Sequence, residues 1–324
     1  MEPVDPKSLQ EAVVCFSHPA NCIAYLVPRR WANGVVCPTC GSKKVAYQEK
    51  RLRWQCSAHH AKRQFSVKVG TIFEDSPLGL DKWMPAVWLL TNCKNGVSSW
   101  ELSRAINVTQ KTAWFMLHRI RMAHQGRNGG KMGGPGSEIE ADETFIGGKS
   151  RNMHPSVRAR KISGTGGKDK AIVMGVLERG GNVRASVVSD RKKKTVQSEV
   201  RKHVEAGSDV FTDALKSYEG LSEYEHQVID HAEMYVNGKV HTNGMENFWS
   251  LLKRGIGGTY VSVEPFHLFR YLDEQMFRYN NRKDSDGEPL NDAARFDLAI
   301  RQIVGKRLTY AELTGKAGET AEAF

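Results

Sequence analysis

A glycine-rich segment near the middle of the chain separates two parts whose residue patterns differ. The stretch GRNGGKMGGPG places six glycines among residues 126–136 of a 324-residue chain. Such a composition is typical of a linker, which we predict over residues 126–137. A chain of this length can hold two or three domains, each with its own core. The two sides of the glycine-rich segment are therefore expected to fold separately.

Beyond the linker, short apolar runs alternate with helical patterns. The sequence RGGN reads as a hairpin turn between two strands, and several further strands and helices follow along the chain. This order predicts an α/β domain with helices packed on a sheet. The expected strands are 138–146, 171–177, 183–189, 209–215 and 226–230, and the expected helices are 194–204, 243–255 and 264–281.

Before the linker, residues 80–124 have a helical pattern. Ser98 and Glu101 have the spacing of a capping box, and Thr109 can cap a second helix after a short turn. Two short helices joined by a tight turn predict a helix-turn-helix, in which Lys111 and Arg119 would be exposed to DNA, as would Gln110 and Thr112. A small helical hairpin without DNA-binding function is the alternative.

Closely spaced cysteines lie upstream of these helices. Cys37 and Cys40 are two residues apart, and Cys56 follows after fifteen residues, ahead of two histidines. Thiolate pairs on a tight turn, repeated after a hairpin-length gap, are typical of structural zinc sites. His59 is taken as the fourth ligand, with His60 as the other candidate. Buried cysteines without a metal are the alternative.

The charge of the chain points to a polyanionic partner. The formal net charge is +11, which in a chain of this size favours nucleic acid. No stretch approaches the 18 or so apolar residues of a membrane span, and the N-terminus lacks the pattern of a signal peptide. We therefore expect a cytoplasmic, DNA-associated protein. A small-molecule enzyme is disfavoured, because there is no glycine-rich phosphate loop and no nucleophile elbow.

Three carboxylates after the linker are candidate metal ligands. Asp142 lies in the first expected strand, Asp213 in a later one, and Glu246 on the helix that follows the last strand. Carboxylates are the usual protein ligands of Mg²⁺, and enzymes that act on phosphodiesters commonly hold two such ions. Each residue also has a structural alternative: Asp142, like its neighbours Glu140 and Glu143, can be a solvated strand residue, and Asp213 can cap a turn.

The helix HTNGMENFWSLLKR raises a separate question about Glu246. Seven residues separate Glu246 from Lys253, so both lie on one face with Ser250 between them. If Asn243 is the N-cap, then Glu246 stands at the third helical position and can bond to free backbone N–H groups. A capping role and a catalytic role are therefore both open for this residue.

In combination, five stretches resemble an insertion-sequence transposase of the DDE superfamily, in the group with an N-terminal zinc ribbon. They are RQFSVKVGTIFEDS (63–76), ADETFIGGK (141–149), TDALKSYEGL (212–221), and HTNGMENFWSLLKRGIGGTY (241–260) with RYLDEQMFRYNNR (270–282). The resemblance covers roughly residues 20–285. Two departures stand out. The family's second zinc pair is rich in cysteine, whereas this chain has CSAHHAK, and some relatives carry asparagine where this chain has Glu246.

The resemblance implies a ribonuclease-H-like mixed sheet with flanking helices, preceded by a zinc ribbon and a helix-turn-helix. It makes Asp142, Asp213 and Glu246 the Mg²⁺ or Mn²⁺ ligands, and Lys253 a phosphate-binding residue. The predicted segments are an N-terminal helical segment (1–34), a zinc-ribbon-like module (35–75), a helix-turn-helix module (76–125), the linker (126–137), a catalytic domain (138–285) and a C-terminal extension (286–324).

The implied activity is metal-dependent cleavage at the ends of an insertion sequence and transfer of those ends into target DNA. Paired ends require at least two subunits, so we expect a homodimer or a larger oligomer. The alternatives are a catalytically inactive, sequence-specific DNA-binding regulator and a host nuclease of similar fold.

A basic segment between the first two strands is a further candidate DNA contact. Residues 147–170 hold seven Lys or Arg residues and one Asp, so they carry +6 of the total charge. Polycationic loops gain affinity for DNA by releasing counterions, which makes Arg158, Arg160 and Lys161 predicted DNA contacts. Arg254, next to Lys253, is another. A solvated charged loop is the alternative reading of the segment.

Overall fold

The computed structural model forms two compact units. It describes residues 5–126, 129–148, 154–161, 170–229 and 241–316. The first unit takes in the chain up to Gly126 and again from Lys283, and the second runs from Arg127 to Arg282. The chain thus passes from the first unit to the second at the start of the glycine-rich segment. No described helix is both long enough and apolar enough to cross a membrane.

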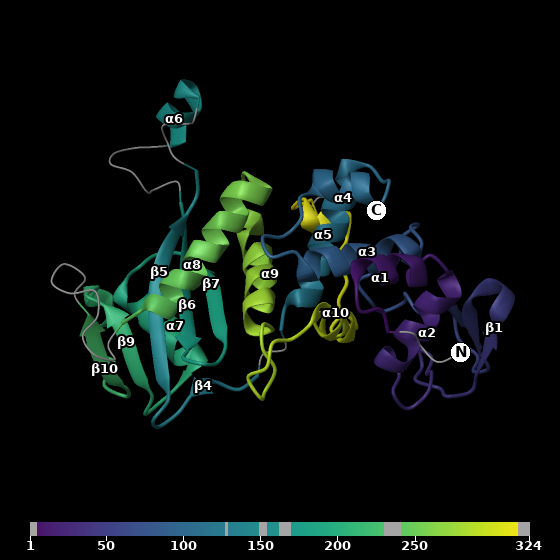
Figure 1. The fold of residues 1–324 in the computed structure, drawn as a ribbon, viewed down its shortest axis with the longest axis horizontal. Helices are drawn as coiled ribbons and strands as arrows, with labels where there is room; N and C mark the ends of the chain where they lie inside the picture. The colour runs from purple at the N-terminus through teal and green to yellow at the C-terminus, as the bar shows by residue number, and fades with distance from the viewer. Residues whose placement is uncertain (1–4, 127–128, 149–153, 162–169, 230–240, 317–324) are drawn as a thin grey trace. The chain divides into compact units, whose positions relative to one another are not determined.

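The first unit is mainly helical (Figure 1). It contains one small antiparallel sheet, in the order β1-β2-β3. Its strands are β1 (Val45–Gln48), β2 (Arg53–Cys56) and β3 (Gln64–Phe65), with a 3₁₀ turn η1 (Glu49–Arg51). Its helices are α1 (Leu9–Phe16), α2 (Pro19–Arg30), α3 (Leu80–Asn92), α4 (Ser99–Ala105), α5 (Gln110–His124), α10 (Asp292–Arg301) and α11 (Tyr310–Leu313).

The core of the first unit joins the two ends of the chain. Phe296 of α10 packs against Phe16, Tyr25 and Trp88, with ring centroids 5.7, 5.5 and 5.0 Å away. Phe16 and Phe296 are fully buried. Arg29 of α2 also pairs with Asp297 of α10. The described residues 283–316 are therefore an integral part of the N-terminal unit.

Helices α4 and α5 begin where their capping residues predict. Ser98 accepts a bond from the Glu101 N–H (3.2 Å), and Glu101 accepts one from the Ser98 N–H (2.8 Å), which completes the capping box. Thr109 caps α5 by accepting from the Thr112 N–H. Between the helices, Asn107 adopts a left-handed conformation with φ +50°, which asparagine tolerates better than most residues. The two helices joined by a tight turn are confirmed.

The second unit is a five-stranded mixed sheet in the order β10-β9-β5-β6-β7. Strand β5 pairs antiparallel with β6 and parallel with β9. The strands are β4 (Met132–Gly133), β5 (Glu138–Ile146), β6 (Ala171–Glu178), β7 (Val183–Val188), β8 (Val204–Glu205), β9 (Asp209–Asp213) and β10 (Glu225–Ile229). The helices are α6 (Pro155–Lys161), α7 (Lys193–His203), η3 (Lys216–Tyr218), α8 (Asn243–Gly255), η4 (Ile256–Tyr260), η5 (Pro265–His267) and α9 (Leu268–Asn280).

Helices cover both faces of this sheet (Figure 1). On one face, Val196 and Val200 of α7 pack against Ile139 and Ala141 of β5. On the other face, α8 and α9 pack against the apolar residues of β5, β6 and β7. Side chains alternate between the two faces of a strand. Burial on both sides therefore places β5 at the centre of the domain.

Most of the expected strands and helices are confirmed, with shifts at their ends. The strand expected to reach residue 215 ends at Asp213, and the helix expected from residue 264 begins at Leu268 after a 3₁₀ turn. The predicted linker needs a correction, because Met132 and Gly133 form β4 and pair with β8. Glycine content alone does not exclude a short strand where a partner strand lies alongside.

Replacing Phe296 with alanine tests the shared core of the first unit. Removing a fully buried aromatic ring leaves a cavity, and we expect a loss of about 3–5 kcal/mol in the unfolding free energy of that unit. Chemical denaturation followed by tryptophan fluorescence measures this change. Phe266→Ala is the matched control, because its ring is 61% exposed. Equal effects of the two substitutions would contradict a core that depends on α10.

Candidate functional site

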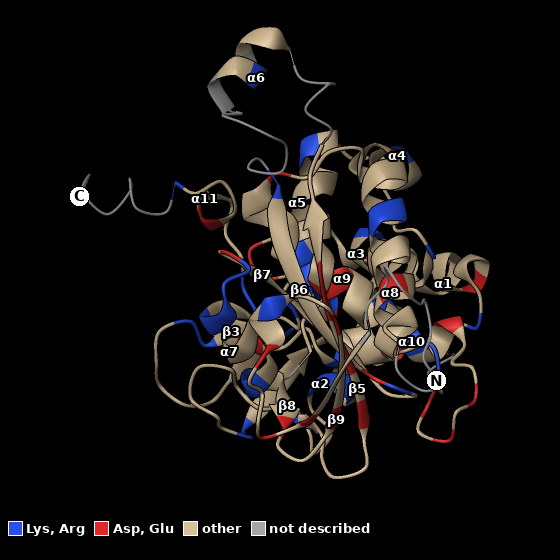
Figure 2. Cartoon of the chain, turned by 90° about the vertical axis from the view of Figure 1, so that its left-hand side faces the viewer, with Lys and Arg blue, Asp and Glu red and all other residues tan. Residues whose placement is uncertain are grey.

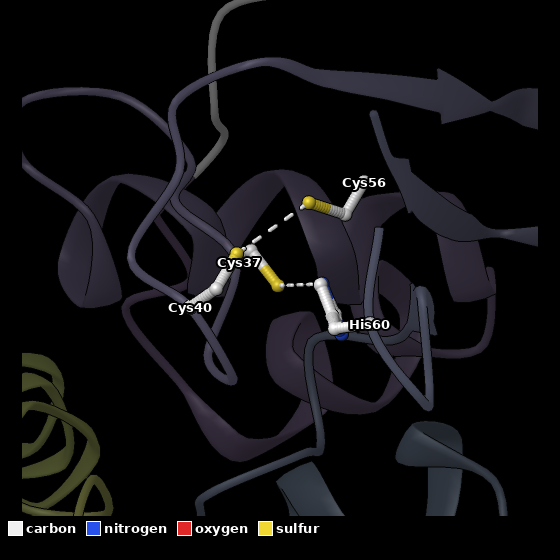
Figure 3. Close-up of side chains that lie close together, drawn as sticks. All are labelled: Cys37, Cys40, Cys56 and His60. Carbon is white, nitrogen blue, oxygen red and sulfur yellow. Dashed lines mark hydrogen bonds between the residues drawn. The ribbon is translucent and has the colours of Figure 1, made fainter. Parts of the chain in front are cut away.

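Four side chains from β2 and the loops beside the small sheet form the first candidate metal centre (Figure 3). Cys37, Cys40, Cys56 and His60 each direct one possible ligand atom into a common space, and these atoms lie within 4.8 Å of one another. Cys37 and Cys40 stand on a turn closed by the Gly41 N–H, which donates to the Cys37 carbonyl (2.8 Å). Cys56 ends β2 and so faces this turn.

The spacing of these atoms fits a tetrahedral zinc ion. Zinc–ligand bonds of about 2.3 Å to sulfur and about 2.05 Å to nitrogen give edges of about 3.8 Å between sulfurs and about 3.6 Å between sulfur and nitrogen. The Cys40 and Cys56 sulfurs are 3.7 Å apart, and the Cys37 sulfur lies 3.5 Å from His60 Nε2. The donor set therefore supports a structural zinc site.

The histidine in this cluster is His60, which corrects the prediction of His59. His59 is exposed, whereas His60 Nδ1 lies 2.5 Å from the Ala61 carbonyl oxygen. A carbonyl oxygen only accepts, so Nδ1 carries the proton and Nε2 is left with the lone pair that a metal requires. Successive residues after a strand point in different directions, and sequence spacing alone cannot choose between the two rings.

The electrostatics of the cluster favour a thiolate at Cys37. Burial raises the pKa of its thiol, but hydrogen bonds from the backbone N–H groups of Cys40 and Thr39 and from the neighbouring thiols outweigh burial and bring the pKa down to about 6. For Cys56, burial dominates and the pKa is raised. The turn thus prepares one anionic ligand before any cation is bound.

The second candidate metal centre lies where β5 and β9 run side by side. Asp142, Glu143 and Asp213 each place a carboxylate oxygen within 4.8 Å of the other two. The parallel register pairs Glu140 with Phe211. Two residues further along, the same register brings Asp142 beside Asp213. Figure 2 shows acidic residues along β5.

The three carboxylates repel one another in a partly dry environment. Burial, followed by the charges of Glu143 and Asp213, raises the pKa of Asp142 to about 7. Burial and the Asp213 charge also raise the pKa of Glu143. Crowded carboxylates of this kind are stabilised by a cation with oxygen preference, such as Mg²⁺. The donor set therefore fits a divalent hard cation.

Glu143 is the member of this cluster that sequence reasoning missed, because it was interpreted as a solvated neighbour of Asp142. Its carboxylate accepts from the hydroxyl of the fully buried Tyr218 (3.0 Å) and pairs with Arg191 (3.3 Å). The signal that could have revealed it is the run EIEADE within a strand at the centre of a sheet. Such a strand is expected to be apolar on both faces, so acidic residues in it indicate a functional role.

Two neighbours hold Asp142 in place. The indole Nε1 of Trp249 donates to Asp142 Oδ2 (2.9 Å), and the Glu143 N–H donates to Oδ1 (2.8 Å). Trp249 approaches this closely because Gly175 stands opposite Asp142 on β6. A Cβ added to Gly175 would lie 2.9 Å from the indole ring. The position of Trp249 was not predicted either.

A cavity of about 480 Å³ opens between β5 and α8. It is lined by Asp142, Glu143, Thr144, Glu246, Trp249, Ser250 and Lys253. The predicted common face of Glu246, Ser250 and Lys253 is thus turned toward Asp142. Asp142 and Glu143 belong to both the cavity and the carboxylate cluster, whereas Asp213 belongs to the cluster and Glu246 to the cavity wall.

Glu140 holds the N-terminus of α8 against the sheet. Its carboxylate is 1% exposed and accepts from the Met245 N–H (2.9 Å). It also pairs with Arg179 (2.9 Å) and lies 3.3 Å from His241 Nδ1. The first residue of α8 is Asn243, which was considered as the N-cap. Glu246 therefore stands at the fourth helical position rather than the third. The carboxylate that bonds the first turn is Glu140, and its burial rules out the alternative that it is a solvated strand residue.

The predicted DNA-contacting residues differ in exposure. Lys111, Arg158 and Arg254 are exposed, whereas Arg119 is only 3% exposed, which contradicts the expected solvent-facing side chain. The cause is tertiary: the Arg119 guanidinium donates to the Glu74 carbonyl and lies over the Trp83 ring. Arg158 stands on α6, on which Figure 2 shows a blue segment. The side chains of Arg160 and Lys161 lie outside the described residues.

The segments that hold the two candidate metal centres match known families of transposase domains. Residues 132–280 match the family described as ISXO2-like transposase domain, and residues 19–61 match the transposase zinc-ribbon domain. The chain is 30% identical over 278 residues to an uncharacterized protein in transposable element ISH50 of Halobacterium salinarum, which covers 80% of this chain and 90% of that protein. It is 32% identical over 97 residues to an uncharacterized transposase-like protein of Haemophilus influenzae, covering 29% of this chain and 78% of that protein.

The zinc centre predicts different effects for the two histidines. His60→Ala removes the Nε2 ligand, and we expect zinc affinity to fall at least about tenfold, since even residues that only orient a ligand are worth 10–100-fold. His59→Ala is the matched control and keeps full zinc content. Competition with a chromophoric chelator measures both variants. Loss of zinc in His59→Ala, with His60→Ala unaffected, would reverse the assignment.

Proposed function

Because the chain belongs to the insertion-sequence transposases that carry a zinc ribbon and a DDE domain, we propose that it cuts DNA at the ends of its insertion sequence and joins them to target DNA. One observation carries the proposal: carboxylates of β5 and β9 converge beside a cavity whose opposite wall holds Glu246 and Lys253. In this reading the mixed sheet with helices on both faces is a ribonuclease-H-like domain.

The metal ligands are Asp142, Asp213 and Glu246, with Glu143 as a further carboxylate of the same site. Divalent ions bound there would polarise phosphoryl oxygens and lower the pKa of a bound water. Asp142 is oriented for this role by Trp249. Glu143 is held by Tyr218 and Arg191 from the other side of the strand.

Lys253 binds a phosphate of the DNA near the scissile bond. Its ammonium group is a compact charge on a long stem and needs no fixed geometry to contact a phosphate. It lines the cavity two helical turns from Glu246, with Ser250 between them. A DNA strand lying along this wall of α8 would meet the ammonium group and the carboxylates together.

The reaction consists of two in-line displacements at phosphorus. In the first, a water oxygen bonds to phosphorus, the bond to the 3′ oxygen breaks, and a free 3′-OH results. In the second, this 3′-OH attacks a phosphodiester of the target DNA and displaces the 3′ oxygen of one target strand. Neither step needs a covalent bond to the protein or a net oxidation.

Glu140 sets the distance between the two walls of the site. It lies two residues from Asp142 on β5, and its carboxylate bonds the Met245 N–H, next to Glu246. The pairing with Arg179 compensates its buried charge. Sheet and helix are therefore joined two residues from Asp142 on β5 and one residue from Glu246 on α8.

The zinc ribbon, the α4–α5 pair and the basic segment around α6 supply the DNA contacts. Lys111 at the start of α5, Arg158 on α6 and Arg254 on α8 are exposed cations. Arg160 and Lys161 belong to the same basic segment. Two insertion-sequence ends require two active sites, so the active form contains at least two copies of the chain.

Substitution of the carboxylates tests the proposed chemistry. We expect Asp142→Asn, Asp213→Asn and Glu246→Gln each to reduce end cleavage and joining at least about 100-fold, because metal-ion stabilisation is worth several kcal/mol. Glu143→Gln is expected to reduce both as well, by a smaller factor. The assay uses DNA with the element's own ends and Mg²⁺ or Mn²⁺, with strand products resolved on denaturing gels.

Glu225→Gln is the matched control, because this exposed carboxylate lies on β10 outside the cluster and the cavity. It should retain wild-type rates. Tight binding of the ends without cutting by the wild type, with either metal ion, would favour the inactive regulator. Cutting without joining would favour a nuclease.

The basic segment predicts a steep salt dependence of DNA binding. Each phosphate contact contributes a slope of about 0.9 in log K against log salt. Changing Arg158, Arg160 and Lys161 to Glu is therefore expected to flatten the slope by about 3. Fluorescence anisotropy of labelled duplex at several salt concentrations measures it.

Changing Lys192, Lys193 and Lys194 to Glu is the matched control, because these three exposed residues at the start of α7 give the same change in net charge. If this variant flattens the slope equally, the effect is one of overall charge. A slope unchanged in the first variant would exclude the contact.

A further inference from the structure

A second cavity in the first unit lies against the opening turns of α5 and has no part in the metal chemistry. Its volume is about 350 Å³, within the range of small-ligand sites. Three aromatic rings line it, from Trp83 of α3, Phe115 of α5 and Tyr310 of α11. Phe115 and Tyr310 meet edge to face, with ring centroids 5.7 Å apart. The walls thus offer flat apolar surfaces.

Two cations line the same cavity. Lys111 places its ammonium group 4.7 Å from the centre of the Tyr310 ring. Arg119 lies 5.4 Å from the Phe115 ring and 5.5 Å from the Trp83 ring. Lys111, Phe115 and Arg119 are four residues apart, so they form one stripe along α5. The cavity therefore combines aromatic surfaces with positive charge on the helix proposed to enter DNA.

Arg119 is buried without full compensation. Its side chain is 97% buried, and its Nε has no hydrogen-bond acceptor among the described residues. The guanidinium donates to the Glu74 carbonyl, and in the described part of the chain it forms no ion pair. Asp75 also lines the cavity, but its carboxylate pairs with Arg307 (2.8 Å). A buried donor without an acceptor is costly, so an anion in this cavity would be stabilised.

We infer that the cavity binds one unpaired nucleotide of the DNA, with its base against Tyr310 and Phe115 and its phosphate near Lys111 and Arg119. Paired bases present only their edges in the grooves of a duplex, so the aromatic walls cannot stack on them. An unpaired base exposes its faces, and stacking on an aromatic ring is worth about 1–3 kcal/mol. The location also fits, because residues at the start of the second helix are those that approach DNA in a helix-turn-helix.

This inference rests on the proposed action at DNA ends, where strands fray and unpaired nucleotides occur. It goes beyond that action by assigning a separate role to α11. Tyr310 is held at the cavity by a capping box between Thr309 and Glu312. Helix α11 would thus complete a nucleotide site beside the first turns of α5.

The test compares two DNA probes on the full-length protein. One probe is a blunt duplex of the element's end, and the other is the same duplex with a single unpaired 2-aminopurine. The wild type is expected to prefer the second probe by about fivefold or more, the lower end of what stacking of one base provides. Its 2-aminopurine fluorescence should be quenched on binding.

Three variants make the test specific. Tyr310→Ala is expected to bring the affinity ratio of the two probes to about one and to abolish quenching, whereas Tyr310→Phe keeps the ring and the preference. Trp100→Ala is the matched control, because this tryptophan on α4 is 64% exposed and lies outside the cavity. It should leave the ratio unchanged. Lys111→Gln should lower the ratio.

If the wild type binds both probes with equal affinity and without quenching, the inference is wrong. Cleavage of blunt ends would still support the proposed function. If Trp100→Ala lowers the ratio as much as Tyr310→Ala, the site is also wrongly assigned. If free dAMP competes as strongly as the probe with the unpaired base, the assignment of the cavity to DNA is wrong. Conversely, Asp142→Asn should stop cleavage and keep the ratio, so the two proposals can fail separately.

Discussion

The buried carboxylate of Glu140 connects the sheet of the second unit to helix α8. It accepts from the Met245 N–H, and Arg179 and His241 surround it. A buried charge of this kind is stable only when it is paired and hydrogen-bonded, so strand, helix and arginine are specified together. This contact places the start of α8 beside β5. The Trp249–Asp142 hydrogen bond and the apolar packing of α8 on the sheet hold the rest of the helix, so that Glu246 and Lys253 line the cavity opposite Asp142.

Both candidate metal centres follow the same physical rule. In each, the fold brings possible ligand atoms within 4.8 Å of one another: three sulfurs and an imidazole nitrogen around Cys37, and carboxylate oxygens around Asp142. The ligand chemistry separates the two, because sulfur and nitrogen select zinc and oxygen selects Mg²⁺ or Mn²⁺. The zinc cluster stabilises a three-stranded sheet too small to have a large core. The carboxylate cluster lies in a well-packed sheet, and its carboxylates are therefore available for the proposed catalytic role.

The first unit combines segments from both ends of the chain. Phe296 of α10 completes the aromatic core of α1, α2 and α3, and Tyr310 of α11 lies against α5. The second unit, which holds the proposed catalytic site, is therefore inserted in the chain between two parts of the unit proposed to bind DNA. Two chain connections, rather than one, then join the first unit to the second. After the first connection, β4 pairs with β8 within the second unit.

Local sequence determined the features that depend on near neighbours. The capping residues Ser98 and Thr109 predicted where α4 and α5 begin, and apolar periodicity predicted β5 and α8, because such signals act within a few residues. Tertiary structure alone decided which histidine joins the zinc cluster, that Arg119 is buried, and that Glu143 meets Asp213. Each of these depends on side-chain direction and on atoms distant in sequence. The alternation of residues in a strand predicts which face of the sheet a side chain lies on, but not which residues it contacts there.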